Sequence, residues 1–147
     1  MKMNKIRVSR ASDADILIAA EIESRCFSHP WKADDFKSHR DGGLFLVAKL
    51  GEDTAGYISI TTVLDEAYIN TIACDERFRR MGIASSLLNE AAKQLRRQGS
   101  AFLTLEVRGS NAPAISLYKK LGYKEVGIRP RFYRDPDEDA ILMTLYL

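Results

Sequence analysis

The segment Arg79-Arg80-Met81-Gly82-Ile83-Ala84 joins a strand-like run, Tyr68–Cys74, to a helix-like run that ends near Gln98. A tight turn with a single glycine at the start of a helix aims several free backbone N–H groups at one point. With the positive end of the helix dipole, these groups make a receptor for phosphate, and the two arginines add positive charge. The segment therefore predicts a phosphate-binding turn, with an ordinary basic turn before a surface helix as the alternative.

The turn lacks the features of two other phosphate-binding motifs. No Gly-Lys-Ser/Thr follows it, so the magnesium and γ-phosphate chemistry of a P-loop is missing. No three-glycine dinucleotide fingerprint is present either. What remains is an Arg-x-x-Gly-x-Ala turn at the junction of a strand and a helix.

Length and composition limit the class of protein. With 147 residues, 46% of them hydrophobic, the chain suits one core and is too small for two comfortable domains, so we expect a single domain over residues 1–147. The net charge of +2 is small, which argues against a dedicated nucleic-acid binder. Cys26 and Cys74 lack metal-ligand spacing, so we expect small buried hydrophobes and no metal.

The sequence shows no sign of a membrane or export segment. No apolar run approaches membrane-spanning length, and Met1-Lys2-Met3-Asn4-Lys5 leads directly into strand-like sequence. We therefore expect a soluble cytoplasmic protein.

Hydrophobic periodicity and turn residues predict the order β-α-α-β-β-β-α-β-α-β-β. Strands are expected at residues 6–8, 44–50, 56–64, 68–74, 102–107, 123–128 and 140–147. Helices are expected from the Ser12-Asp13 cap, from Pro30-Trp31 to about Arg40, over residues 82–98, and from the Ser110-Asn111 cap to before Gly122. This order predicts an α/β (α+β) fold: a mixed, mostly antiparallel sheet of about seven strands with about four flanking helices.

One carboxylate stands out in this pattern. Glu106 lies in the otherwise apolar strand 102–107, where it must be paired, at an open end of the sheet, or functional. An ion pair with a neighbour such as Arg108 is the structural alternative. Tyr118 falls on the inner face of the next helix, where an aromatic side chain is most often core, and Asn111 is in the position of a simple helix cap.

Taken together, Glu106, Asn111 and Tyr118 are a more specific functional signal than any one of them alone. The run Leu105-Glu106-Val107-Arg108-Gly109-Ser110-Asn111 continues through Ala114-Ile115-Ser116-Leu117-Tyr118 to Gly122-Tyr123. It resembles the Leu-Glu-Val-Arg-x-Ser-Asn-x-x-Ala-Ile-x-Leu-Tyr-x-x-x-Gly-Phe signature of the RimI branch of the GNAT family, the ribosomal-protein alanine N-acetyltransferases. Glu21-Ile22-Glu23, Cys26–Trp31 and Glu138–Met143 are similar to further family segments, so the resemblance spans essentially the whole chain.

The departures from the family pattern are mild. Met81 lies within the pyrophosphate turn, Ala84 replaces its second glycine, and Tyr123 replaces the usual phenylalanine. The loop before Glu138 differs more, which bears on substrate preference rather than on the reaction.

The resemblance implies a GNAT fold and a metal-free reaction that uses acetyl-CoA as co-substrate. Ile72-Ala73-Cys74 would pair with the pantetheine arm, residues 79–85 would hold the pyrophosphate, and Asn111 would contact the cofactor. The implied cofactor-binding residues are Ile72, Ala73, Cys74, Arg79, Arg80, Met81, Gly82, Ile83, Ala84, Ser85 and Asn111.

The resemblance also implies the chemistry and the acceptor. Glu106 matches the family's general base and Tyr118 its proton donor to the departing thiolate. The implied acceptor is a protein N-terminus, the alanine of a small-subunit ribosomal protein. An α-amine, with a pKa of roughly 7.7–8.0, is more often deprotonated at neutral pH than a lysine amine with a pKa of about 10.4, so a single carboxylate base suits it better.

Other readings remain as alternatives. The same scaffold can acetylate protein lysine side chains or a small-molecule amine, since a fold does not fix the acceptor. A non-catalytic acyl-CoA sensor would need neither Glu106 nor Tyr118. An RNA-binding ribosome-associated factor would carry a basic patch with interleaved aromatics, which this sequence lacks, so no direct nucleic-acid binding is expected.

The loop before the last strand is ambiguous. Its acidic cluster, Asp135, Asp137, Glu138 and Asp139, can attract a basic peptide. The nearby arginines, Arg129, Arg131 and Arg134, can equally neutralise it. Both readings stay open at this point.

Overall fold

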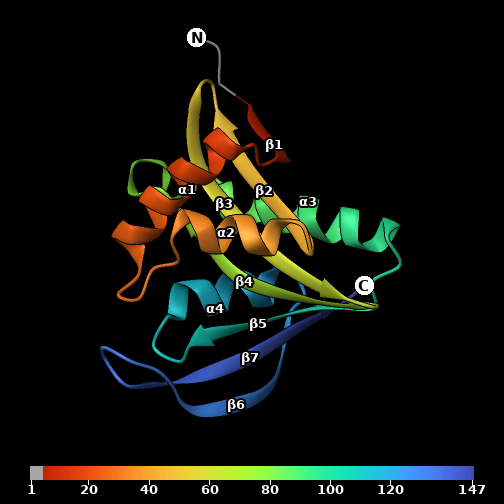
Figure 1. The fold of residues 1–147 in the computed structure, drawn as a ribbon. Coiled ribbons are helices and arrows are strands. Elements are labelled where there is room, and N and C mark those ends of the chain that lie inside the picture. Colours follow the sequence, from red (N-terminus) through yellow and green to blue (C-terminus); the bar gives the residue numbers. More distant parts are fainter. Residues whose placement is uncertain (1–4) are drawn as a thin grey trace.

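The computed structural model describes residues 5–147, so the expectation about Met1–Asn4 lies outside the described residues. The strands form one seven-stranded sheet in the order β1-β2-β3-β4-β5-β7-β6 (Figure 1). They are β1 (Ile6–Arg10), β2 (Gly43–Leu50), β3 (Asp53–Val63), β4 (Glu66–Cys74), β5 (Phe102–Arg108), β6 (Lys124–Tyr133) and β7 (Glu138–Tyr146). The helices are α1 (Asp13–Cys26), α2 (Ala33–Arg40), α3 (Ile83–Arg97) and α4 (Ala112–Lys120), with a short 3-10 turn at Glu76–Phe78. The predicted order of elements and the mixed sheet are confirmed.

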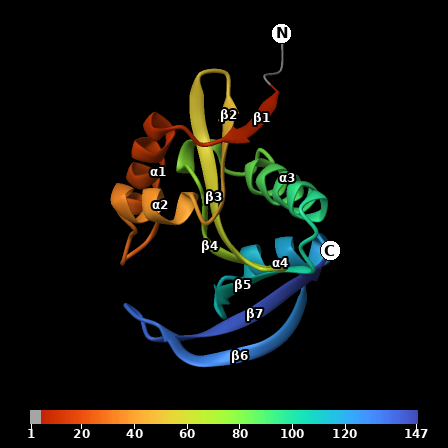
Figure 2. The ribbon, with the colours of Figure 1, turned by 45° about the vertical axis from the view of Figure 1, so that its right-hand side comes forward.

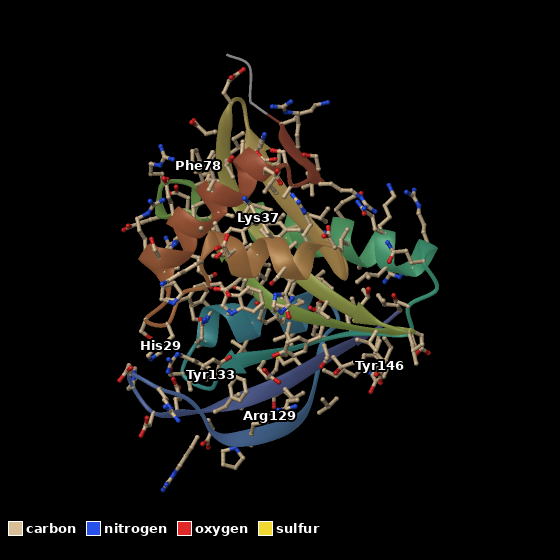
Figure 3. All side chains as sticks on the ribbon, in the orientation of Figure 1. His29, Lys37, Phe78, Arg129, Tyr133 and Tyr146 are labelled. Carbon is tan, nitrogen blue, oxygen red and sulfur yellow. The ribbon has the colours of Figure 1, made fainter. Side chains whose placement is uncertain are left out.

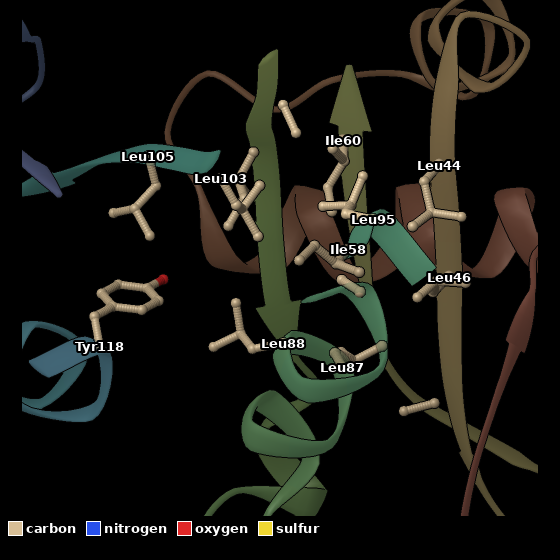
Figure 4. Close-up of a cluster of buried hydrophobic side chains, with 14 of the residues drawn as sticks. Leu44, Leu46, Ile58, Ile60, Leu87, Leu88, Leu95, Leu103, Leu105 and Tyr118 are labelled. Carbon is tan, nitrogen blue, oxygen red and sulfur yellow. The ribbon is translucent and has the colours of Figure 1, made fainter. Parts of the chain in front are cut away.

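Helices cover both faces of the first four strands. Figure 2 shows α1 and α2 on one side of β1–β4 and α3 on the other. The apolar stripe of α3 packs onto the sheet as its sequence predicts, with Leu87, Leu88 and Leu95 at most 1% exposed. These leucines meet Leu46 and Ile58 of β2 and β3 in one core cluster (Figure 4).

The second core cluster lies under α1 and α2. Phe36 of α2 packs edge-on against Phe45 of β2 and Tyr57 of β3, with ring centroids 5.2 and 5.5 Å apart. Because successive side chains of a strand point to opposite faces, β2 and β3 supply both clusters and are buried on both sides.

The sheet splits between β4 and β5. These two strands run parallel, and they pair only where Glu66–Tyr68 faces Phe102–Thr104. Beyond that point β4 stays paired with β3 up to Cys74, while β5 stays paired with β7 up to Arg108. Figure 1 shows the two strands diverging, with α4 beside the opening. The facing edges of residues 69–74 and 105–108 are therefore left without a partner strand.

Several element boundaries differ from the sequence expectation. Strand β1 ends at Arg10 rather than at residue 8, β3 begins at Asp53 rather than at residue 56, and β7 begins at Glu138 rather than at residue 140. Helix α2 begins at Ala33 rather than at Pro30-Trp31, because Asp35 accepts from the backbone N–H of Lys32 and makes that residue the N-cap. Strand β6 runs to Tyr133 rather than to Ile128. A bulge between Arg129 and Tyr133, with Arg131 at φ +52°, breaks the alternation by which the sequence signals a strand.

No helix among residues 5–147 is long and apolar enough to cross a membrane.

Candidate active site

The opening between β4 and β5 is a cavity of about 850 Å³. Its two long walls are the diverging strands, at Ile69–Ile72 of β4 and Leu105–Arg108 of β5. The α1 C-terminus with the α1–α2 loop and the β6–β7 turn line one end, and α4 lines the other. In an unbroken sheet this space would be filled by a ladder of backbone hydrogen bonds, so the split creates the cavity.

Glu106 and Tyr118 reach this cavity from opposite faces of the sheet. Leu105 and Val107 of β5 belong to the core cluster on the α3 and α4 side, so Glu106, which lies between them, points to the other face. Tyr118 comes from α4 and packs within that same core cluster. Both line the cavity, because only at the split can groups from the two faces meet.

The carboxylate of Glu106 is held by two side chains from neighbouring strands. Its side chain is 4% exposed. The hydroxyl of Tyr68 on β4 donates to Oε2, and the Nε of Arg129 on β6 lies 3.3 Å from Oε1. Burial of Tyr68 and its bond to Glu106 raise the pKa of the Tyr68 phenol, which therefore remains a donor at neutral pH.

Arg108 does not pair with Glu106, contrary to the structural alternative drawn from the sequence. Its side chain points into the β6–β7 turn, where it donates to the carbonyls of Arg134 and Pro136 at 2.7 and 2.8 Å. It also forms an ion pair with Glu138 at 3.4 Å and lies 4.6 Å from the ring centroid of Tyr133. Arg108 lies two residues after Glu106 and therefore on the same face of β5, but its guanidinium is engaged by the β6–β7 turn, which leaves Glu106 to Arg129.

Tyr118 is a buried phenol whose hydroxyl has no hydrogen-bond partner among residues 5–147. Figure 4 shows its ring beside Leu105 and its hydroxyl pointing away from α4. Burial raises its pKa to about 12. The group is therefore fully protonated at neutral pH, which suits a proton donor and not a base.

The turn before α3 carries free backbone N–H groups, as the sequence predicts. Gly82 is the N-cap at φ +82°, and Arg80 also has a positive φ of 64°. The backbone N–H groups of residues 80–85 meet no acceptor in the described part of the chain, and the first helical bond is from Ser86 to the carbonyl of Gly82. Residues 79–82 are exposed. An anion is the natural partner of such a concave set of donors at a helix N-terminus.

The β4 edge beside this turn is the other unpaired backbone. Asp75 donates its N–H to Ala55 of β3, so by alternation Ala73 also faces β3, while the backbone groups of Ile72 and Cys74 face the split. The side chains of Ile72 and Cys74 pack on the α3 side, and that of Ala73 packs on the α1 side. This edge can pair with an extended, amide-containing chain.

The structure brings some predicted site residues together and leaves others apart. Glu106, Tyr118, Asn111 and Ile72 line the cavity. Cys74 and the turn at residues 79–85 continue from the C-terminal end of β4, outside the cavity lining. Asn111 is also the N-cap of α4, with its side chain accepting from the N–H of Ala114 at 3.3 Å, so the cap alternative and the cavity position both apply.

Neither cysteine is arranged for catalysis. Cys26 and Cys74 are unpaired thiols of intermediate exposure, so the expectation that they are buried is only partly met. Burial raises the pKa of the Cys74 thiol, which disfavours the nucleophilic thiolate. Within residues 5–147 no group of histidine, cysteine or carboxylate side chains is arranged to hold a metal.

The acidic cluster of the β6–β7 turn is mostly bound to other parts of the chain. Asp135 contacts His29 at 2.6 Å, Glu138 pairs with Arg108, and Asp139 accepts from the N–H of Arg131 at 2.9 Å. Figure 3 shows His29 of the α1–α2 loop near Tyr133, on the side of the molecule where Arg129 also lies. Among residues 5–147 no side-chain ion pair joins these acidic residues to Arg129, Arg131 or Arg134, so the contacts do not decide between the two readings left open by the sequence.

Some residues of the site were not identified from the sequence. Tyr68 lies 38 positions before Glu106, and Arg129 was noted only as a neighbour of the acidic cluster. Glu23, 3% exposed, also lines the cavity. No local pattern marks Tyr68 and Arg129 because strand pairing brings them to the split, and Glu23 reaches the cavity through the packing of α1 on the sheet.

Known proteins match this chain over most of its length. Residues 16–123 match the acetyltransferase (GNAT) family. The ribosomal protein bS18-alanine N-acetyltransferase of Escherichia coli (strain K12) is 38% identical over 142 residues, which cover 94% of this chain and 95% of the relative. The N-alpha-acetyltransferase of Sulfurisphaera tokodaii is 33% identical over 158 residues, with coverage of 97% and 93%.

The fold comparison agrees. The crystal structure of the ribosomal-protein-S18-alanine N-acetyltransferase from Escherichia coli superimposes with a TM-score of 0.89 at 36% identity, over 97% of this chain and 94% of that one. The split sheet, the glycine turn before α3 and the identity over nearly the full length of both proteins lead to one conclusion: the chain belongs to the acetyltransferase (GNAT) family.

Proposed function

We propose that this protein transfers an acetyl group from acetyl-CoA to the N-terminal α-amine of a protein, the N-terminal alanine of a small-subunit ribosomal protein. The observation that carries the proposal is the meeting of a carboxylate, Glu106, and a protonated phenol, Tyr118, in the cavity between β4 and β5. Amine acetylation by a thioester needs one group to take a proton and another to give one.

The unpaired backbone fits acetyl-CoA. The N–H groups of residues 80–85 match a pyrophosphate, and the side chains of Arg79 and Arg80 are exposed beside them. The free edge of β4 at Ile72 and Cys74 matches the amides of a pantetheine arm. When bound, acetyl-CoA supplies an already activated acetyl group, so no metal is required.

Glu106 is proposed as the general base. A free α-amine has a pKa of roughly 7.7–8.0 and is largely protonated at neutral pH, so its proton must be removed before it can attack. Tyr68 and Arg129 support the ionised carboxylate with a hydrogen bond and an opposite charge. Because the side chain of Arg129 is 56% exposed, its ion pair can exchange for solvent at little cost when an acceptor binds.

Tyr118 is proposed as the general acid. With its pKa raised to about 12, the phenol keeps its proton until the sulfur of coenzyme A departs with negative charge. Negative charge develops on the sulfur only in the chemical step, so a donor beside it acts on turnover rather than on cofactor binding.

The acceptor assignment rests on the relatives. The E. coli protein is named for the alanine of bS18, and the two proteins align over nearly their full lengths. The acceptor end of the cavity is walled by the α1–α2 loop and the β6–β7 turn, including Phe27, Trp31 and Tyr133. Ribosomal proteins are made in the cytoplasm, so we propose that the enzyme acts there.

The test is a peptide assay read by mass spectrometry. The protein is incubated with acetyl-CoA and a peptide that begins Ala-Arg, and in parallel with the same peptide blocked at its N-terminus and carrying an internal lysine. Acetylation of the free α-amine is expected. Faster acetylation of the blocked peptide would promote the lysine acceptor, and acetylation of neither peptide, with a small amine accepted instead, would promote the small-molecule acceptor.

A further inference from the structure

Glu23 is a buried carboxylate that the proposed reaction does not use. It lies near the end of α1, is 3% exposed, and lines the cavity. Its Oε1 accepts from the hydroxyls of Tyr57 on β3 and Thr71 on β4, the latter at 2.7 Å. Its Oε2 accepts from the backbone N–H of Trp31 at 2.9 Å.

No cation balances this charge. Among the ion pairs of residues 5–147, none includes Glu23. A buried carboxylate without a counter-ion is retained only when several donors satisfy it. Here all three donors are neutral, and burial together with the negative charge of Glu23 raises the pKa of Tyr57, so its hydroxyl stays a donor.

The three donors belong to two different parts of the structure. Tyr57 and Thr71 are on the central strands β3 and β4, which pair with each other along their length. Trp31 is in the α1–α2 loop, whose residues Phe27, Ser28 and His29 form the acceptor wall together with Trp31. Glu23 therefore joins this wall to strands β3 and β4, with one oxygen to each side.

We propose that Glu23 is a positioning residue that fixes the α1–α2 wall against β4 and thereby restricts the acceptor to a small first residue. The inference rests on the proposed function, because it concerns the acceptor end of the same site. A wall that is held in place rejects a larger side chain by steric clash, whereas a wall that can move accepts it.

The substitution Glu23→Gln removes one of the two acceptor oxygens that hold the wall, while it keeps the size and shape of the side chain. A glutamine has one carbonyl oxygen, which can serve the two hydroxyls or the Trp31 N–H but not both, and its NH₂ then faces a donor. Asp15→Asn is the matched control, because Asp15 is a second buried carboxylate of α1, 6% exposed, whose carboxylate accepts from the N–H of Ser12 and pairs with Lys49, neither of which lines the cavity. Both variants lose side-chain contacts of α1, but only Glu23→Gln loses a contact with the α1–α2 loop.

Two readouts decide the proposal. The first is kcat/KM for peptides that begin with alanine or with leucine and are otherwise identical. We expect Glu23→Gln to lower the ratio of kcat/KM for the alanine peptide to kcat/KM for the leucine peptide by about tenfold. This is within the range by which an apolar pocket discriminates between side chains of slightly different size. The second is amide hydrogen exchange of residues 27–32, which should speed up by about tenfold as the Trp31 N–H loses a charged acceptor. The affinity for acetyl-CoA should stay unchanged.

An unchanged preference in Glu23→Gln overturns the proposal, and so does an equal loss of preference in Asp15→Asn, since general weakening of α1 would then explain it. If Glu23→Gln does not fold, Glu23→Asp makes the same comparison, because it keeps the charge but is too short to reach both sides. If the wild type acetylates neither peptide, the proposed function fails on its own. In that case amide hydrogen exchange tests the positioning role of Glu23, and an unaltered exchange rate at residues 27–32 in Glu23→Gln overturns the proposal.

Discussion

Replacing two neighbouring tyrosines with phenylalanine separates catalysis from packing. The rings of Tyr118 and Tyr123 lie 5.5 Å apart, both residues are buried, and burial raises both pKa values. Tyr118 lines the cavity and Tyr123 does not. The hydroxyl of Tyr123 is buried without a partner among the described residues. The same chemical change is thus made at two adjacent sites, only one of which faces the cavity.

The expected magnitudes follow from these contacts. Tyr118→Phe should lower turnover on the order of 10²- to 10⁴-fold, the usual contribution of a positioned proton donor. Its stability should change by less than about 1 kcal/mol, because no hydrogen bond to another residue is lost. Tyr123→Phe removes an unsatisfied buried hydroxyl, so it should gain about 1 kcal/mol. For a domain of this size that is a rise of roughly 2–4 °C in Tm, with turnover unchanged.

The assay is steady-state turnover under saturating acetyl-CoA, with Tm measured on the same samples. Saturation matters because it isolates the chemical step from cofactor binding. If both variants turn over alike, Tyr118 is a core residue and the proton-donor role is wrong. If Tyr118→Phe loses activity only in proportion to a fall in Tm, packing explains the loss.

Three further outcomes are expected. Glu106→Gln should keep acetyl-CoA affinity and lose most turnover, with the residual rate rising with pH as the acceptor amine deprotonates unaided; wild-type turnover at pH 7 would make Glu106 structural. Gly82→Ala should weaken acetyl-CoA binding at least tenfold, about 1.4 kcal/mol by calorimetry, because the turn of donors depends on its φ of +82°. Gly99→Ala, at φ +84° and equally open, carries the same backbone strain of about 1–2 kcal/mol away from the turn and should leave affinity intact. Burial holds the pKa of Tyr118 at about 12 against an ordinary 10.0, so the folded state retains a proton that the unfolded chain loses. The free energy of unfolding, measured in urea, should therefore fall as the pH rises above about 10, and less steeply in Tyr118→Phe; a stability that rises over this range would contradict the burial argument.

The sequence predicted most of the fold because its signals are local. The stripe of apolar residues on α3 and the Ser12 and Asn111 caps depend only on spacing along the chain, and each appears in the structure. The boundary errors at α2 and β6 have different causes: the Asp35 cap together with the Glu23 contact at α2, and a bulge at β6. Trp31 precedes α2 with its N–H bound to Glu23, and β6 continues through an irregularity that hides its alternation.

The free backbone N–H groups of the turn before α3 could also be predicted from the sequence. A strand, one glycine and a helix already imply that free N–H groups converge, because the geometry of a helix start is set by the backbone itself. The position of Gly82 at φ +82° confirms that local inference. Glu106 was recognisable as an anomaly in an apolar strand, although the sequence could not tell which residue accompanies it.

The arrangement around that carboxylate was decided only by tertiary structure. Arg108, next but one along the strand, points to the β6–β7 turn, whereas Tyr68 and Arg129 reach Glu106 from other strands. Strand order and register set such neighbours, and neither is encoded in the spacing of a single segment. The sequence by itself determined which segments are helices and strands and which turn leaves its backbone N–H groups free. The early divergence of β4 from β5 is a property of the assembled sheet, and it alone brings side chains from both faces into one cavity.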